Sequence, residues 1–243
     1  MRAPQVSLVV VNYGTPRLLS RLLASVDRSP DQDLVREVII VDNGYPDKGD
    51  SRETVDPAGY PFPMAFAQNE EHSYASGVNR GAALARGDVL VIANTDIELL
   101  PDVSLLPVVE AVRDGQPRVG IAAPQLVYPD GSWQQTARRF PSIGEAALAA
   151  LMVDTLWHAL LTWTFRRGAR VGRTLPVDYV DGALMAVDLA CFRALGGFDP
   201  SYGFYGEDAD FCWRAAAAGW RTVLVPSARV IHLRGASSEV DHP

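Results

Sequence analysis

Short apolar runs alternate with segments of helical periodicity along the first half of the chain. Continuous apolar runs, of the kind found in strands buried on both faces, predict strands at 6–11, 38–41, 64–67, 88–93 and 120–123. Helical periodicity predicts helices at 18–26, 76–86 and 105–112. Thr15 and Pro16 precede the first helix and supply an N-cap and a first-turn proline. Strands alternating with helices predict an α/β fold.

The second half departs from this alternation. The turn residues Pro129, Asp130 and Gly131 predict a hairpin, residues 143–165 have the pattern of a long apolar helix, and 183–187 that of a strand. No internal repeat or low-complexity linker separates the two halves. We therefore expect one domain over residues 1–243, with an elaborated second half.

Composition narrows the classes of protein and partner. The 243 residues are 48% hydrophobic and 21% charged, which is ordinary for a globular protein. A net charge of −7 without a basic stripe argues against a nucleic-acid partner. Cys191 and Cys212 lack metal-ligand spacing and are expected to be buried, reduced thiols. Because the N-terminus has no signal-peptide pattern and no apolar run reaches about 18 residues, we expect a cytoplasmic protein.

Three carboxylates crowd the predicted start of a helix in the second half. Glu207, Asp208 and Asp210 follow a glycine-flanked aromatic turn. One acid in a first helical turn complements the helix dipole, but three repel one another, and such local conflicts are typical of functional sites. The segment is therefore the best candidate for a catalytic base.

Polar residues also follow three of the predicted strands. They are Asn12-Tyr13, Asp42-Asn43-Gly44 and Asn94-Thr95-Asp96. Each group alone could be turn or capping chemistry. Together they would meet at one edge of an open α/β sheet, where ligands bind. An aromatic ring, an acceptor for a base N–H and carboxylates for a divalent metal suit a nucleotide-sugar.

These motifs carry a resemblance. The chain resembles the family 2 glycosyltransferases, and is most similar to their bacterial rhamnosyltransferase-like branch. The stretches that match are VSLVVVNY at 6–13, IIVDNG at 39–44, GVNRG at 77–81, GDVLVIANTD at 87–96, DGALM at 181–185, GGFDP at 196–200 and YGEDADFCWR at 205–214, followed by His232 and Gly235. The resemblance implies the GT-A nucleotide-diphospho-sugar transferase fold, a Rossmann-like domain with a mixed central sheet. Residues 1–125 would form the donor half and 126–243 the acceptor half, with a helical insertion at about 143–170.

The resemblance also implies roles on the donor side. Tyr13 and Asp42 would contact a pyrimidine base, with Asn12 and Asn79 in the same donor pocket. Asp96 would bind the metal, Mg²⁺ or Mn²⁺, as the second acid of an Asp-x-Asp motif. Asn94 stands where that motif has its first acid and would face the donor, leaving one carboxylate fewer for the metal. His232 would complete the metal shell, although a single histidine beside a strand also suits a structural role.

On the acceptor side the resemblance makes Asp208 the general base. The helix dipole is expected to keep Asp208 ionised, so that it can take a proton from the acceptor hydroxyl. Glu207 and Asp210 would orient the site, and Asp181 and Asp210 would contact the acceptor. The expected reaction moves a sugar from a nucleoside-diphosphate donor, dTDP-rhamnose or else a UDP-hexose, to a saccharide or lipid-linked saccharide with inversion.

Three other functions stay open on the sequence. A nicotinamide-dependent oxidoreductase should carry Gly-x-Gly-x-x-Gly after the first strand, and residues 12–16 do not supply it. A sugar-diphosphate hydrolase would use similar acids. A catalytically degraded nucleotide-sugar-binding or scaffolding relative would account for Asn94.

The catalytic motifs leave residues 143–170 unexplained. This segment is rich in alanine and leucine, contains Trp157 and Trp163, and ends with Arg166, Arg167 and Arg170. The pattern suits an interfacial helix on the inner face of the cell membrane, with tryptophans at headgroup level and arginines near anionic lipid. It equally suits a helix in the core or in a homodimer interface.

Overall fold

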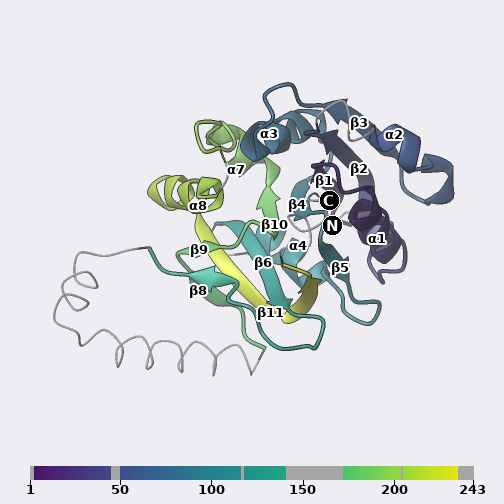
Figure 1. Cartoon of the computed structure of the whole chain (residues 1–243). Coiled ribbons are helices and arrows are strands. Elements are labelled where there is room, and N and C mark those ends of the chain that lie inside the picture. Colours follow the sequence, from purple (N-terminus) through teal and green to yellow (C-terminus); the bar gives the residue numbers. More distant parts are fainter. Residues whose placement is uncertain (1–2, 45–49, 116–117, 141–171, 204, 235–243) are drawn as a thin grey trace.

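The computed structural model describes residues 3–44, 50–115, 118–140, 172–203 and 205–234 (Figure 1). The strands are β1 (Val6–Asn12), β2 (Val35–Asp42), β3 (Met64–Gln68), β4 (Val89–Asn94), β5 (Ile97–Leu99), β6 (Val119–Val127), β7 (Ala137–Arg138), β8 (Leu175–Val177), β9 (Tyr179–Val180), β10 (Leu184–Asp188) and β11 (Arg221–His232). The helices are α1 (Pro16–Asp27), α2 (Ser51–Thr54), α3 (Tyr74–Leu84), α4 (Leu106–Asp114), α7 (Leu189–Ala194) and α8 (Glu207–Ala217), with 3₁₀ turns η1 (Gln32–Leu34) and η3 (Pro57–Gly59).

Nine of the strands in the described part of the chain form one mixed sheet with helices on both faces, and β7 pairs with β9 in a separate two-stranded sheet. The order of the larger sheet is β3-β2-β1-β4-β10-β6-β11-β5, and β8 pairs with β11. β1, β2, β3 and β4 are parallel to one another, whereas β10 runs antiparallel to β4 and β6. α1 and α4 pack into the core on one face, and α3, α7 and α8 into the core on the other. This is the mixed α/β sheet that the sequence predicts.

The parallel register brings the polar strand ends to one edge of the sheet. Asn12 of β1 is paired with Asp42 of β2, and Val11 is paired with Asn94 of β4. The backbone N–H of Asn94 donates to Ala183 O at 2.9 Å, which ties β4 to the start of β10. The meeting of three polar strand ends that the sequence predicts is therefore confirmed.

α3 packs closely on the sheet beside this edge. A Cβ atom at Gly81 would lie 2.4 Å from Val9 Cγ1, and one at Gly77 would lie 3.0 Å from Val11 Cγ1. The two glycines thus let α3 approach β1 closely, which places the start of α3 above the carboxyl ends of β1 and β4.

The structure corrects the predicted N-cap of the first helix. Pro16 occupies the first turn of α1 as expected, but the Thr15 side chain makes no capping hydrogen bond. Its Oγ1 instead contacts Asn12 Oδ1 at 3.0 Å and Thr95 Oγ1 at 2.9 Å. Thr15 therefore links the polar ends of β1 and β4.

Most other predicted elements are present with shifted bounds. The helix predicted from 76 begins at Tyr74, and the predicted hairpin closes through the N–H of Gly131 donating to Tyr128 O and a bridge between Val127 and Trp133. Cys191 and Cys212 are free and buried, as expected. The segment 143–170 lies outside the described residues. Within the described part of the chain, no helix is long and apolar enough to cross a membrane.

Candidate active site

The ends of β1 and β2 form a rigid polar shelf. The Asn12 amide donates to Asp42 Oδ1 at 3.1 Å and to Ser51 Oγ at 2.9 Å. Asp42 also accepts hydrogen bonds from the Ser51 backbone N–H, at 3.0 Å, and from the Ser51 hydroxyl. Tyr13, next along the chain, is 40% exposed. The shelf thus combines a fixed carboxylate with an accessible aromatic ring, as stacking on a base requires.

Asp96 and His232 converge at the end of β4 and β11. His232 Nε2 lies 3.5 Å from Asp96 Oδ2, and both residues are buried. Asp96 Oδ1 is buried without a hydrogen-bond partner among the described residues. A buried carboxylate oxygen left without a partner carries a desolvation cost that a bound cation would offset. The pair therefore fits a divalent metal.

Gln134 fixes the tautomer of His232. The Gln134 Nε2 donates to the carbonyl of His232, at 2.6 Å, and to that of Val127, at 3.3 Å. Its Oε1 consequently faces His232 Nδ1, at 2.9 Å, and accepts the proton there. With the ring neutral and its proton on Nδ1, Nε2 would carry a lone pair on the side of Asp96, which is the form in which histidine ligates a metal. Sequence reasoning missed Gln134, because it reaches His232 only through tertiary contact.

The two side chains supply only part of a coordination shell. No group of three or more His, Cys, Asp or Glu residues suited to a metal exists in the described part of the chain. Mg²⁺ typically keeps several waters and binds through one or two carboxylates plus substrate phosphates. Asp96 and His232 would leave the other coordination positions of the metal open for water and for a diphosphate.

Tyr74 at the start of α3 reaches the same place. Its hydroxyl donates to Asn94 Oδ1 at 2.8 Å. Burial raises the pKa of Tyr74 well above its ordinary value, and the negative charges of Glu207, Asp208, Asp96 and Asp181 raise it further, in that order. The charges of Asp96 and of the first acids of α8 therefore all reach the phenol of Tyr74. The sequence offered a signal for Tyr74, since it stands just before the Gly77–Gly81 motif.

A strained turn introduces α8. Tyr205 and Gly206 have φ values of 71° and 99°, both in the left-handed region. Glycine adopts this region readily, but a tyrosine there is unusual, and such residues often lie at functional sites. Tyr205 is 82% exposed, whereas Glu207, the first residue of α8, is 7% exposed. The turn thus directs the first carboxylate of α8 inward and leaves an aromatic ring outside.

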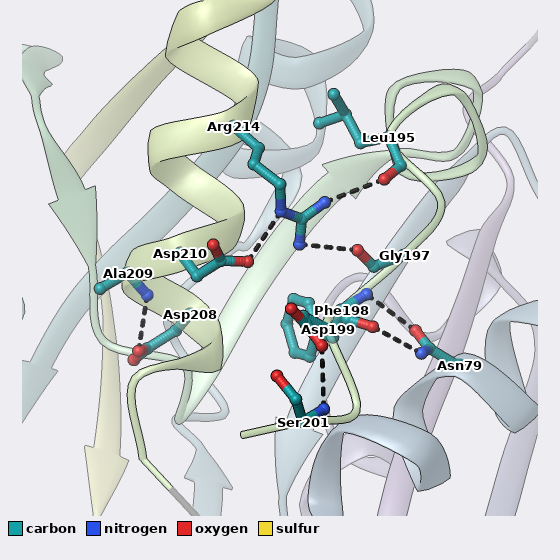
Figure 2. Close-up of polar contacts among 10 residues, drawn as sticks. All are labelled: Asn79, Leu195, Gly197, Phe198, Asp199, Ser201, Asp208, Ala209, Asp210 and Arg214. Carbon is teal, nitrogen blue, oxygen red and sulfur yellow. Dashed lines mark hydrogen bonds and ion pairs between the residues drawn. The ribbon is translucent and has the colours of Figure 1, made fainter.

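Asp208 is held by backbone donors from two elements. Its Oδ2 accepts from the N–H of Gly182 at 2.9 Å, and its Oδ1 accepts from the N–H of Ala209 at 2.7 Å; Figure 2 shows the second of these bonds. A Cβ atom at position 182 would lie 3.2 Å from Asp208 Cβ. The glycine after Asp181 therefore allows the chain to approach the carboxylate closely.

Burial dominates the electrostatics of both acids in the first turn of α8. It raises the pKa of Asp208, an effect opposed by the hydrogen bonds from Gly182 and Ala209 and strengthened by the charge of Asp181. It also raises the pKa of Glu207, whose Oε2 is buried without a partner among the described residues. Burial therefore opposes the helix dipole, and the expectation that Asp208 is kept ionised stays a prediction. A raised pKa makes Asp208 a stronger base once it is ionised.

Two predicted site residues hold the turn before α8 in place. Figure 2 shows Asn79 donating to Phe198 O and accepting from Phe198 N, both at 2.8 Å. Arg214 donates to Asp210 Oδ2 at 2.7 Å and to the carbonyls of Leu195 and Gly197, each at 2.9 Å. Asp210 thus holds Arg214 against the turn at 195–197, and its expected orienting role in the site stays a prediction. The donor contact of Asn79 and the acceptor contact of Asp210 stay predictions.

Asp181 joins the site through its charge and its neighbours. Its backbone N–H donates to Thr136 O at 2.8 Å, and its Oδ1 accepts from the N–H of Ala183 at 3.2 Å. Nearby, Arg234 is exposed and donates to the hydroxyl of Tyr128 at 3.2 Å. The hydrogen bond to Tyr128 raises the pKa of Arg234 most, and the charge of Asp181 contributes. The guanidinium of Arg234 thus feels the charge of Asp181.

A family model described as "Glycosyltransferase like family 2" matches residues 4–241. The chain belongs to this family. It is therefore a hexosyltransferase that uses a nucleotide-sugar, and the resemblance seen in the sequence is confirmed.

Individual relatives agree with the family. The chain is 29% identical over 248 residues to the N-acetylglucosaminyl-diphospho-decaprenol L-rhamnosyltransferase of Mycobacterium tuberculosis, covering 96% of this chain and 78% of the relative. Among solved structures, GalNAc-T7 with UDP, GalNAc and Mn²⁺ superposes with a TM-score of 0.69 at 17% identity, over 95% of this chain and 44% of that chain. The mannosyltransferase PcManGT of Pyrobaculum calidifontis, in complex with GDP-Man and Mn²⁺, gives 0.64 at 18%, over 96% and 58%. The chain thus spans less than two thirds of each solved chain, and these likenesses establish the GT-A fold.

Proposed function

We propose that this glycosyltransferase moves rhamnose from dTDP-rhamnose to a hydroxyl of a lipid-linked saccharide, with inversion at the anomeric carbon. One observation carries the transfer chemistry. The N–H of Asn94, two positions before Asp96, donates to Ala183 O at 2.9 Å, and the N–H of the adjacent Gly182 donates to Asp208 Oδ2 at 2.9 Å, so the segments that carry Asp96 and Asp208 meet at residues 182–183. The metal-binding acid and the base therefore share one site. The choice of rhamnose rests on the named activity of the mycobacterial relative, and a UDP-hexose is the alternative donor.

Each half of the chain would bind one of the two substrates. Residues 1–125 supply the donor side, where Tyr13 stacks on the base and Asp42 accepts a base N–H. Residues 126–243 supply the acceptor side through Asp181 and α8. Asp96 and His232 would hold Mg²⁺ or Mn²⁺, which offsets the charge that develops on the departing nucleoside diphosphate.

Asp208 performs the proton transfer. As the acceptor oxygen attacks the anomeric carbon, Asp208 takes the hydroxyl proton, and the electrons of the breaking bond leave with the diphosphate. The bonds from Gly182 and Ala209 hold the carboxylate in one orientation. Glu207 and Asp210 orient α8 rather than form a covalent intermediate, so a single displacement inverts the sugar.

We further propose a peripheral contact with the inner face of the cell membrane through residues 143–170. The sequence of that segment supports the contact, because it combines tryptophans with a cluster of arginines. The N–H of Phe140 donates to Asp178 Oδ2 at 2.8 Å, and its ring stacks on Tyr179 with centroids 5.6 Å apart. Phe140, which precedes the segment in the sequence, therefore lies beside β9, whose end is close in sequence to Asp181. A homodimer through the same segment is the alternative.

A transfer assay tests the proposed function. The protein is incubated with Mn²⁺, a polyprenyl-diphosphate N-acetylglucosamine acceptor, and either dTDP-rhamnose or UDP-glucose, and the anomeric configuration of the product is read by NMR. We expect rhamnosyl transfer with inversion. Transfer from UDP-glucose alone would overturn the donor. Nucleotide binding without transfer to any acceptor would favour the binding or scaffolding relative. Ligand at 100 times its dissociation constant should add about 2.7 kcal/mol to the free energy of unfolding.

A further inference from the structure

The hydroxyl of Tyr74 has one acceptor among the described residues, the side-chain oxygen of Asn94 at 2.8 Å. The position of the ring is fixed locally. Ser73 caps α3 by accepting from the N–H of Ser76 at 3.1 Å, and Tyr74 is the first residue of that helix. A phenol carries a single proton at neutral pH. The acids that surround it therefore face a hydroxyl whose proton is already committed to Asn94.

This bond determines which end of the Asn94 amide faces the ligand. Because Asn94 Oδ1 accepts from Tyr74, the NH₂ group points away from the phenol. The backbone N–H of Asn94 is used in the sheet, where it donates to Ala183 O. Among the described residues, the Asn94 NH₂ donates to no protein acceptor, and the side chain is only partly buried. It stands two positions before Asp96, at the edge where the donor binds.

We propose that Tyr74 is a positioning residue that turns Asn94 so that its NH₂ donates a hydrogen bond to an oxygen of the nucleotide-sugar. The inference rests on the proposed donor site. In this arrangement the Asn-Thr-Asp sequence provides one metal-binding carboxylate, Asp96, and one neutral donor, Asn94. A carboxylate at position 94 would instead add negative charge beside Asp96, Asp181, Glu207 and Asp208, and would repel a diphosphate.

A double-mutant cycle tests the coupling. The variants are Tyr74→Phe, Asn94→Ala and the double variant, and Tyr60→Phe is the matched control, since its ring stacks on Phe62 in the core on the other face of the sheet. Calorimetry measures binding of dTDP and dTDP-rhamnose with Mn²⁺. We expect Tyr74→Phe to weaken binding about three- to tenfold, as loss of one oriented hydrogen bond does. Asn94→Ala should weaken binding at least as much, and the double variant should lose no more than Asn94→Ala.

The pattern of losses distinguishes the possible outcomes. Weaker binding of both ligands places the contact on the diphosphate, and weaker binding of dTDP-rhamnose alone places it on the sugar. Losses that add in the double variant, or wild-type binding in Tyr74→Phe, overturn the inference. A purely structural Tyr74 would lower the melting temperature and leave affinity unchanged, because the phenylalanine ring fills the same space.

The variant Asn94→Asp provides an independent test of the proposal. Aspartate can still accept from Tyr74, but it offers no NH₂ and adds a charge. We expect this variant to bind dTDP with Mn²⁺ more weakly than Asn94→Ala does. Tighter metal-dependent binding would show that position 94 ligates the metal, and would overturn the inference. If the wild-type protein binds neither dTDP nor UDP with Mn²⁺, the proposed donor site fails together with this inference. Wild-type binding that Tyr74→Phe leaves unchanged contradicts the inference alone.

Discussion

Asp208 is the carboxylate whose surroundings best match a general base. It is held by two backbone N–H groups, and burial raises its pKa. Asp208→Asn keeps the shape and loses the proton acceptor, so we expect kcat to fall about 10²–10⁴-fold while dTDP binding is unchanged. Steady-state kinetics and calorimetry measure the two effects. The exposed Asp102→Asn is the control, and more than a third of wild-type activity in Asp208→Asn would remove it from this role.

Glu207 should make folding stability depend on pH in a distinctive direction. Burial raises its pKa in the folded state above the ordinary value of 4.5. At a pH between the unfolded-state pKa and the folded-state pKa, the folded state therefore binds more protons than the unfolded state. The free energy of unfolding therefore falls as pH rises through this window. Glu207→Gln lacks the buried charge, and we expect it to be more stable than wild type at pH 8 and similar at about pH 4. Urea unfolding in EDTA measures this, with the exposed Glu53→Gln as control; an equal difference at both pH values would contradict it.

The contributions of the metal ion and of the nucleotide base to donor binding should be separable by mutation. Asp96→Asn removes the charge opposite His232 Nε2, so we expect nucleotide binding to lose its dependence on Mn²⁺. Tyr13→Ala should instead weaken binding with and without metal, because stacking on a base contributes about 1–3 kcal/mol. Calorimetry with dTDP in Mn²⁺ and in EDTA measures both. Unchanged affinity in Tyr13→Ala would place the base elsewhere.

At the scale of elements, the turn at 195–198 links α3 to α8. Asn79 satisfies both backbone polar groups of Phe198, which is 1% exposed. Asn79→Ala leaves these groups without partners, at a cost of about 1–3 kcal/mol for a buried group. We expect a lower melting temperature and a lower kcat, since the turn positions the helix that carries Asp208.

The neighbouring exposed Arg80→Ala is the matched control for Asn79→Ala. Thermal unfolding and steady-state kinetics separate two roles. A loss of donor affinity in Asn79→Ala with unchanged melting temperature would show instead that Asn79 contacts the donor directly, as the resemblance implies.

The elements that the sequence predicts are those whose own residues form a recognisable local pattern. β1, β2 and β4 are apolar runs long enough to indicate buried strands, and three acids mark the start of α8. β5 and β9 are short and pair with strands distant in sequence, so no local pattern indicates them. The same limit applies within the site. Asp96 and Asp208 stand in motifs, whereas Gln134 and the Arg214 contacts with Leu195 and Gly197 exist only because the fold brings them together.

At the scale of the whole molecule, the acceptor has to reach Asp208. The proposed lipid-linked acceptor would present its hydroxyl near a bilayer, so the enzyme would have to work at that surface. Residues 143–170 are the part of the sequence suited to contact it, since they combine tryptophans with an arginine cluster. The segment begins just after Phe140, whose ring stacks on Tyr179. A contact there would bring the acceptor half toward the lipid.

Replacing Trp157, Leu160 and Trp163 together by serine should therefore abolish sedimentation with anionic liposomes and leave dTDP binding intact. Loss of buried apolar area removes the driving force for insertion, whereas the donor side stays unchanged. Trp213→Ser is the matched control, because Trp213 is 59% exposed on α8, outside this segment. If wild-type protein ignores such liposomes and the triple variant loses self-association instead, the segment forms a subunit interface, and a soluble acceptor then becomes the better proposal.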